Sequence, residues 1–472
     1  MTTSISRRQF VHRCSACSAG LAIAPSLAFA NLTAPLPSPP RGTERAKVAM
    51  IFEYPDPSQP NWPNIGYDFE GRINEVKKLL KSGCPDIDFN FISTMDGSEA
   101  EGTKILAQTT DADGYGIYHT GTLWGNLTET IAAGGKPTVM IDHLYAGSGE
   151  FLTSFAKAKR DGHKVAAVSS SRDEDMIQSI RLFSTLKKLQ QSRILVVGRE
   201  GDTKIQEAYG TEMVGMNYDP LSESYKRISR KDAENQAGDW IRKANRVIEP
   251  SESDIFEGAR MYLGMKQLMA DYNAQAITVN CLTGIYGGQL PVAYPCLGFM
   301  ALNDQGLVGA CEADQRSVLT MLLMSYLVGR PGFISDPVID TSKNRIIYAH
   351  CVAPTRVFGP EGSQNPYDLR SHSEDRKGAC NRSLMPLGEM TTTIQFDHNK
   401  KQVIFHQGIS VENVDDDRAC RNKLAVEVKG DVYKLLDEWD QWGWHRVTFF
   451  GNHKKEIYDM ARFLDFEVLE EA

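Results

Sequence analysis

This sequence lacks the short motifs that mark several common enzyme classes. It has no G-x-x-x-x-G-K-S/T phosphate loop, no G-x-G-x-x-G after a strand-like run and no G-x-S-x-G nucleophile turn. It also lacks a basic excess, since 60 Asp and Glu outnumber 52 Lys and Arg for a net charge of −8. Phosphate binding needs a basic face, so this balance argues against a nucleic-acid partner. No apolar run reaches the roughly 18 residues of a transmembrane helix, so we expect no membrane span in the mature chain.

The first 30 residues have the pattern of a twin-arginine export signal. Arg7 and Arg8 are followed by a small, mostly apolar stretch over residues 16–30 that ends in Ala28-Phe29-Ala30, an A-x-A-like cleavage site. The alternative is a basic cytosolic arm followed by a short helix. We predict a signal peptide over residues 1–30, a Pro-rich linker over 31–46, and a periplasmic or otherwise exported mature protein.

The cysteines lack the paired spacing of a metal site. Cys14 and Cys17 would leave with the signal, and the other seven of the nine cysteines are scattered along the chain. This scatter disfavours a structural zinc site, and although an exported protein can form disulfides, the sequence fixes no pairing. Apolar neighbours predict that Cys281, Cys311 and Cys351 are buried thiols.

With 472 residues the chain is long enough for two or three domains. From residue 47 onward, short apolar runs alternate with helical patterns, which is typical of a parallel, doubly wound sheet. The strands expected in a first α/β domain, residues 47–164, are 48–52, 87–92, 114–118 and 137–141. The rhythm restarts in a central α/β domain, residues 165–300, with strands expected at 164–168, 193–197 and 276–280.

The pattern changes after about residue 300. An apolar helix is expected over 318–328, followed by a segment rich in strands. The strands expected there are 345–350, 391–396, 402–405, 424–428 and 445–450. We therefore predict an α/β fold with two doubly wound domains followed by an α+β C-terminal domain, residues 301–472, rich in antiparallel strands.

Few residues stand out in the first half. His119 and the loop 120–125 follow an expected strand and are candidates to line a cleft at the carboxyl edge of the sheet. An ordinary strand-to-helix loop explains the same pattern.

The most informative stretch runs from residue 303 to residue 351. Glu312 lies where an apolar segment meets a helix start, Asp336 precedes a proline, and His350 ends an apolar strand. Taken singly, each has a plain structural explanation. These are a helix cap for Glu312, a turn residue for Asp336 and a hydrogen-bonded core histidine for His350.

Taken together, these segments resemble the core of L-fucose isomerase and its relatives. Glu312 and Asp336 are separated by 24 positions, with a Leu/Met-rich helix and Gly-Arg-Pro-Gly (329–332) between them. A late segment, Gly443-Trp444-His445 followed by a strand and a helix, is similar to the L-arabinose isomerases. The resemblance is carried mainly by residues 300–465, and before residue 300 it depends on architecture.

The resemblance implies a metal-dependent aldose–ketose isomerase, an intramolecular oxidoreductase acting on a monosaccharide through an ene-diol. Glu312 and Asp336 would be both catalytic groups and metal ligands, and His350 and His445 would complete the ligand set. Carboxylates with imidazole suit Mn²⁺, with Mg²⁺, Co²⁺ or Fe²⁺ as alternatives. Relatives of this kind are usually homo-oligomers.

Two further residues carry open alternatives. His372 lies in a segment similar to a loop of fucose-isomerase-like proteins, where it either touches substrate or is a solvated loop histidine. Trp444 either offers an apolar face to the sugar or is a core tryptophan.

Two other functions compete with the isomerase. One is an exported sugar-binding protein, in which Glu312, Asp336 and His445 would have no reason to converge. The other is a catalytically inactive isomerase relative.

Overall fold

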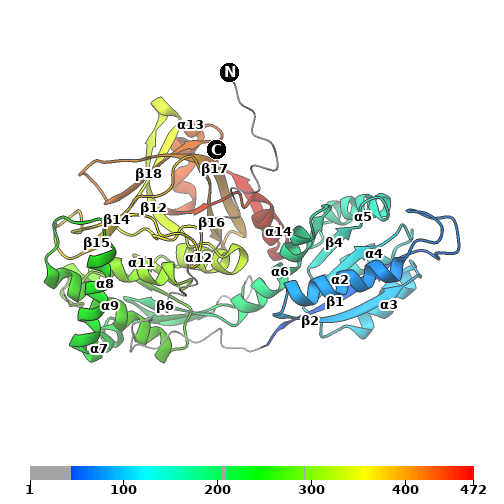
Figure 1. The fold of residues 1–472 in the computed structure, drawn as a ribbon, viewed down its shortest axis with the longest axis horizontal. Coiled ribbons are helices and arrows are strands. Elements are labelled where there is room, and N and C mark those ends of the chain that lie inside the picture. The colour runs from blue at the N-terminus through cyan, green and yellow to red at the C-terminus, as the bar shows by residue number, and fades with distance from the viewer. Residues whose placement is uncertain (1–43, 205–208, 292) are drawn as a thin grey trace, which may run out of the picture. The chain divides into compact units, whose positions relative to one another are not determined.

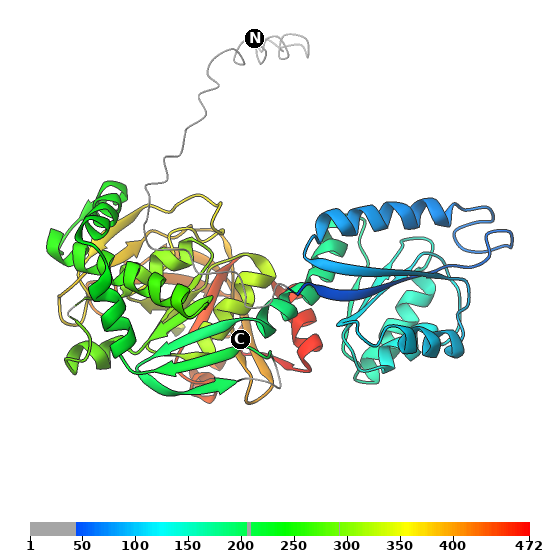
Figure 2. The same ribbon diagram turned by 90° about the horizontal axis from the view of Figure 1, so that it is seen from below.

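The computed structural model describes residues 44–204, 209–291 and 293–472 (Figures 1 and 2). The expected signal peptide, with Cys14 and Cys17, lies outside the described residues, as does the linker up to residue 43. Within the described ranges, no helix has the length and apolar character needed to span a membrane.

The first sheet is parallel and has the order β2-β1-β3-β4-β5. Its strands are β1 Ala46–Glu53, β2 Ile87–Thr94, β3 Gly114–His119, β4 Thr138–Asp142 and β5 Val165–Val168. Its helices are α2 Phe69–Gly83, α3 Glu99–Gln108, α4 Leu127–Ala133, α5 Ser148–Arg160 and α6 Asp173–Gln190 (Figure 1).

Both faces of this sheet are apolar, and helices cover both. In β1, Met50 and Phe52 pack in a core with α2 and α6, whereas Ala49 and Ile51 pack in another with α3 and α4. Successive side chains of a strand point to opposite faces, so a continuous apolar run of this kind requires helices on both sides.

The placement of β5 corrects one expectation. The sequence assigned the strand at 164–168 to the start of the central domain, but β5 pairs in parallel with β4, with Ile141 opposite Val168. The helix that follows it, α6, packs against β1, β4 and β5 of the same sheet. Strand β5 and its helix therefore belong to the first sheet. The domain limits themselves stay a prediction.

The second sheet has the order β11-β10-β6-β8-β7. Its strands β6 Arg193–Val197, β8 Glu212–Met216, β10 Ala276–Val279 and β11 Val308–Cys311 run parallel, and β7 Arg199–Lys204 is antiparallel to β8. The apolar core on one face includes α9 Glu252–Asp271 and α11 Cys296–Asp304, and that on the other includes α12 Gln315–Val328. The remaining helices of this region are α7 Asp219–Arg227, α8 Arg230–Lys243 and α10 Cys281–Tyr286.

The C-terminal sheet is antiparallel and closes on itself like a barrel. Its order is β16-β19-β12-β13-β18-β17, and β16 also pairs with β17. These strands are β12 Phe333–Asp340, β13 Arg345–His350, β16 Met390–Asp397, β17 Gln402–Asn413, β18 Asn422–Val428 and β19 Arg446–Phe450. The short strand β20 Glu467–Glu470 joins β17 in parallel, and helices α13 Val432–Glu438 and α14 Lys454–Leu464 pack nearby.

A small sheet joins β9 Arg246–Val247 to β14 Tyr367–Arg370 and β15 Cys380–Ser383. The chain is therefore a mixed α/β protein with parallel sheets and a C-terminal antiparallel, barrel-like sheet, as the sequence predicted at this level.

Candidate metal and active site

Four of the candidate side chains lie together where the second sheet meets the barrel-like sheet. Glu312 directly follows β11, and Asp336 lies inside β12. His350 ends β13, and His445 comes immediately before β19. The residues that the sequence proposed as one centre, separated by up to 133 positions, are thus brought to one place.

Strand register explains why three of them meet. β12 pairs with β13 on one side and β19 on the other, with Asp336 opposite Ala349 and Ser335 opposite Arg446. Each histidine is the chain neighbour of one of these partners, so both flank Asp336 across the sheet. Asp336 is therefore a strand residue, and its interpretation as a turn residue is wrong.

Glu312 reaches the site through a strained turn. Glu312 and Ala313 both have left-handed backbone angles, with φ of 64° and 52°. This conformation costs an L-residue roughly 1–2 kcal/mol, so the surrounding packing must hold it. The helix cap that the sequence offered as an explanation for Glu312 is supplied instead by Asp314, which accepts hydrogen bonds from the backbone N–H groups of Arg316 and Ser317.

The distances define one cluster of oxygen and nitrogen donors. His445 Nε2 lies 3.2 Å from Asp336 Oδ1 and 3.5 Å from Glu312 Oε2. His350 Nε2 lies 3.6 Å from Glu312 Oε1. Donor atoms of Glu312, His350 and His445 all lie within 4.8 Å of one another, a spacing that can hold a metal ion.

The imidazole nitrogens that face this cluster fit a cation. Both histidines are buried, and in the part of the chain that the structure describes their Nε2 atoms have no hydrogen-bond partner. An orphaned buried nitrogen is costly unless something binds it. Glu312, with a side chain 38% exposed, and Asp336, 24% exposed, leave the centre open to solvent on the carboxylate side.

A second carboxylate fixes the ring of His445. Asp314 Oδ2 accepts a hydrogen bond from His445 Nδ1 at 2.9 Å and another from the hydroxyl of Ser317 at 2.7 Å. This arrangement orients Nε2 toward Glu312 and Asp336, as carboxylate partners of metal-ligating histidines do. Asp314 was not among the predicted site residues, although its place before a helix start is a recognisable cap position.

Electrostatics favour positive charge at this place. Burial opposes the protonation of His445, but the carboxylates of Asp314 and Asp336 beside its ring outweigh burial and raise its pKa to about 9. Burial acts to raise the pKa of Asp314, yet its contacts with His445 and Ser317 lower that pKa to about 2. A site that binds a proton this strongly also attracts a divalent cation.

Three other predictions have clear outcomes. His372 is buried, its ring lies 5.1 Å from that of Tyr294 and its Nδ1 lies 3.3 Å from Asp375, so the solvated loop histidine is wrong. Trp444 is 60% exposed and adjoins His445, so it is not a core tryptophan. Cys281, Cys311 and Cys351 are buried as predicted.

Comparison with known proteins identifies the class of enzyme. No family model matches the sequence. The chain is 22% identical over 371 residues to a sulfoquinovose isomerase of Clostridium sp. (strain MSTE9), covering 73% of this chain and 79% of that protein. It is also 22% identical over 331 residues to a sulfoquinovose isomerase of Priestia aryabhattai, covering 65% of this chain and 71% of the relative.

The carbohydrate transporter of Acidothermus cellulolyticus 11B in complex with myo-inositol aligns with 60% of this chain and 87% of its own at 13% identity. Its TM-score of 0.18 supports no comparison of folds.

The relatives thus support a sugar isomerase. The prediction that the chain is an isomerase, an intramolecular oxidoreductase of the aldose–ketose type, is confirmed. The roles of the individual site residues remain predictions.

Proposed function

We propose that this chain is a metal-dependent aldose–ketose isomerase with its reaction centre at Glu312, Asp336, His350 and His445. The convergence of two carboxylates and two imidazole nitrogens from four distant segments carries the proposal. Among the described residues, neither Nε2 atom has a hydrogen-bond partner. Binding a sugar alone gives no reason for carboxylate and imidazole donor atoms to converge on one another at metal-ligand spacing.

The four side chains would hold one divalent ion. Mn²⁺ is the ion that we propose, with Mg²⁺, Co²⁺ or Fe²⁺ as alternatives. When bound, such an ion stabilises negative charge that develops on neighbouring sugar oxygens. The two histidines, buried and held by Asp314 and by the strand register, would keep the ligand set in place.

The carboxylates would move the proton. Isomerisation removes the proton on C2 of the aldose and returns it to C1 through an ene-diol, and it needs a group that can accept and release that proton. Glu312 is the more exposed of the two carboxylates, so we assign it the exchange with carbon, and we assign Asp336 the proton movement at the oxygens. Each proton transfer of this kind contributes about 10²–10⁴-fold in rate.

The substrate proposed is a monosaccharide. L-fucose and L-arabinose follow from the resemblance of segments 309–336 and 443–450, and sulfoquinovose follows from the names of the relatives. All of these are aldoses, so one test covers them.

The test is proton exchange followed by NMR. Purified mature protein loaded with Mn²⁺ is incubated in D₂O with a panel of these aldoses. We expect deuterium to appear at the carbon that receives the proton, and Glu312→Gln to abolish the exchange. Glu234→Gln, on the exposed face of α8, is the matched control and should exchange as the wild type does. The proposal fails if no sugar exchanges and Glu312→Gln binds Mn²⁺ as well as the wild type.

We further propose the organisation predicted from the sequence. The protein would be exported by a twin-arginine signal over residues 1–30. The mature chain would have two doubly wound domains, over 47–164 and 165–300, and an α+β domain over 301–472. The N-terminal residue of the mature protein, read by mass spectrometry, tests the signal. Sedimentation analysis tests the expected homo-oligomer.

A further inference from the structure

Buried cysteines gather directly behind the candidate active site. Cys281 begins α10, Cys311 ends β11 and Cys351 follows β13, so three separate segments contribute them. The Sγ atoms of Cys281 and Cys311 lie 3.2 Å apart, and those of Cys311 and Cys351 lie 4.0 Å apart. The scatter of cysteines in the sequence argued against clustered thiol ligands, and the fold corrects that expectation.

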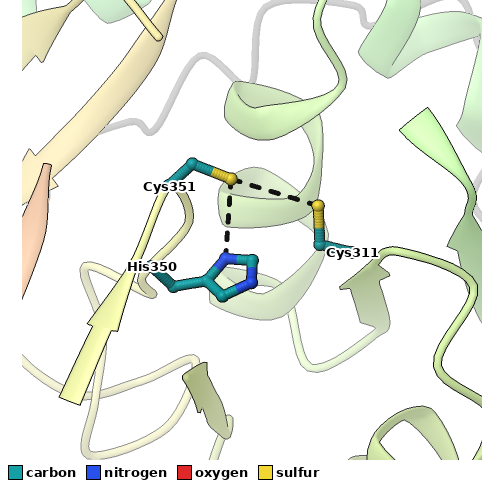
Figure 3. A group of neighbouring side chains, drawn as sticks. All are labelled: Cys311, His350 and Cys351. Carbon is teal, nitrogen blue, oxygen red and sulfur yellow. Dashed lines mark hydrogen bonds between the residues drawn. The ribbon is translucent and has the colours of Figure 1, made fainter. Parts of the chain in front are cut away.

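An imidazole completes this group. His350 Nδ1 lies 3.5 Å from the Sγ atom of Cys351, and Figure 3 shows the ring and the two thiols of Cys311 and Cys351 turned toward one another. Donor atoms of Cys311, His350 and Cys351 all lie within 4.8 Å of one another, and all three side chains are buried. His350 therefore presents Nδ1 to the sulfur donors and Nε2 to the carboxylate of Glu312 in the other site.

The spacing matches tetrahedral coordination by sulfur and nitrogen. With Zn–S bonds of about 2.3 Å and Zn–N bonds of about 2.0–2.1 Å, tetrahedral angles put neighbouring sulfurs about 3.8 Å apart, and sulfur and nitrogen about 3.5 Å apart. The observed separations are 4.0 Å between Cys311 and Cys351 and 3.5 Å between Cys351 and Nδ1. Buried thiols often serve only as small apolar groups, but that role does not explain an imidazole nitrogen directed at them.

We propose that Cys311, Cys351 and Nδ1 of His350 form a second metal site for a thiophilic divalent ion such as Zn²⁺. Thiolate ligands select such ions, whereas the carboxylates of Glu312 and Asp336 suit harder ones. The ion would offset the charge of thiolates that burial otherwise penalises. With both sites filled, the ring of His350 would join them and carry no proton.

This site would position its neighbour. Cys311 directly precedes Glu312, and His350 is itself one of the four side chains of the proposed reaction centre. An ion bound to Cys311 and His350 would hold the strained turn at Glu312 and the orientation of the ring. The role we assign to the thiol site is structural, and it involves no redox step.

Cobalt spectroscopy tests the proposal. Reduced protein freed of metal is titrated with Co²⁺, which gives an intense near-ultraviolet charge-transfer band only when thiolates bind it. We expect this band in the wild type, its loss in Cys351→Ser and Cys311→Ser, and one ion fewer bound per chain in those variants. Cys84→Ser alters a buried free thiol in the first α/β region and is the matched control that keeps the band.

The thiol site and the isomerase proposal fail separately. Glu312→Gln should lose sugar exchange yet retain the charge-transfer band. A wild-type protein that binds Co²⁺ or Cd²⁺ without a thiolate band overturns the thiol site. This outcome is read from the wild type alone, so it does not depend on whether a variant folds. A band that survives in Cys351→Ser, or a mature protein that carries a Cys281–Cys311 disulfide and no ion, also overturns the thiol site.

Discussion

The described part of the chain holds two clusters of carboxylates around histidine, and they differ in access to solvent. The first is the proposed reaction centre, in which Glu312 and Asp336 are partly exposed. The second joins Glu53, at the end of β1, to His119, at the end of β3, and to Glu150 of α5. Glu53, His119 and Glu312 each lie at the carboxyl end of a parallel strand, and both clusters have donor atoms close enough to hold an ion. Position on a sheet therefore does not by itself separate a reactive site from a closed one.

The closed cluster is a buried ion-pair network. Glu53 and His119 are 0% exposed and in direct contact, and Glu150 is 3% exposed. Glu150 also accepts hydrogen bonds from the backbone N–H groups of Leu123 and Trp124, at 2.6 and 2.9 Å, which hold the loop after β3 in place. Burial and the nearby charge of Glu53 raise the pKa of Glu150 to about 7. His119 is buried in this network beside the loop. The interpretation of the sequence in which His119 lines an open cleft is therefore wrong.

The difference between the clusters yields predictions in which function and stability separate. The largest effect is expected for Glu312→Gln, which removes an accessible carboxylate of the reaction centre. We expect kcat to fall about 10²–10⁴-fold, because a proton-transfer group and a ligand are lost together. The free energy of unfolding should change by less than about 1 kcal/mol, since the side chain is partly exposed. A folded Glu312→Gln variant that retains the wild-type kcat would contradict the claim that the exposed cluster is the reaction centre.

In the closed cluster the effect should fall on stability. Glu53→Gln leaves His119 without its charged partner in a fully buried place, and breaking such a pair costs about 3 kcal/mol or more. We expect urea denaturation to report this loss, while Co²⁺ binding at Glu312 and His445 is unchanged in the folded variant. Glu234→Gln, which breaks an exposed pair with Arg230, should cost less than about 1 kcal/mol. Equal losses in the two variants would contradict the assignment.

The third prediction concerns pH in the metal-free protein. The pKa of His445 is raised from its ordinary 6.5 to about 9, so its protonated form stabilises the fold. This contribution is fully present below pH 6.5 and is lost as the pH rises through 9, a change of roughly 2–3 kcal/mol in the free energy of unfolding. Denaturation at pH 6.5 and pH 9.5 with a chelator present measures it.

His445→Gln is the control for this experiment, since it removes the titrating group and should flatten the change. Metal binding should show the opposite trend, because an ion must displace the proton on His445 and its affinity therefore rises up to about pH 9. A metal affinity that is independent of pH in this range would argue against His445 as a ligand.

A smaller effect is expected for Asp314→Asn. The variant keeps a side chain that can cap α12 but loses the charge that orients the ring of His445. Loss of such a partner typically weakens metal binding 10–100-fold. Calorimetric titration with Mn²⁺ measures the change, and we expect the thermal midpoint to stay near that of the wild type. An affinity equal to that of the wild type would show that the orientation of His445 does not depend on Asp314.

Much of the fold follows from local patterns in the sequence. The apolar runs predicted as strands at 48–52, 114–118 and 276–280 lie within or largely coincide with β1, β3 and β10, because buried parallel strands are apolar along their whole length. β12 was missed because Asp336-Pro337 reads as a turn, although the proline in fact lies opposite Tyr348 within an antiparallel pair. The sequence also could not predict which sheet β5 joins, because its pairing depends on how the helices that follow it pack.

The site could be assembled from the sequence only through family resemblance. Glu312, Asp336 and His350 have plain structural explanations one by one, and the register of β12 between β13 and β19 is what unites them with His445. No local pattern predicts that Cys281, Cys311 and Cys351 share one place, because their contacts depend on three separate segments. Burial, which distinguishes the two carboxylate clusters, is likewise a property of the folded chain.

The most direct measurement is an anomalous difference map from crystals of the mature protein soaked in Mn²⁺. The account predicts one strong manganese peak bounded by the carboxylates of Glu312 and Asp336 and by Nε2 of His350 and His445, and a map without density at Glu53, His119 and Glu150. A peak at the buried N-terminal cluster alone, or no peak beside Glu312 in crystals that bind the ion, would contradict it.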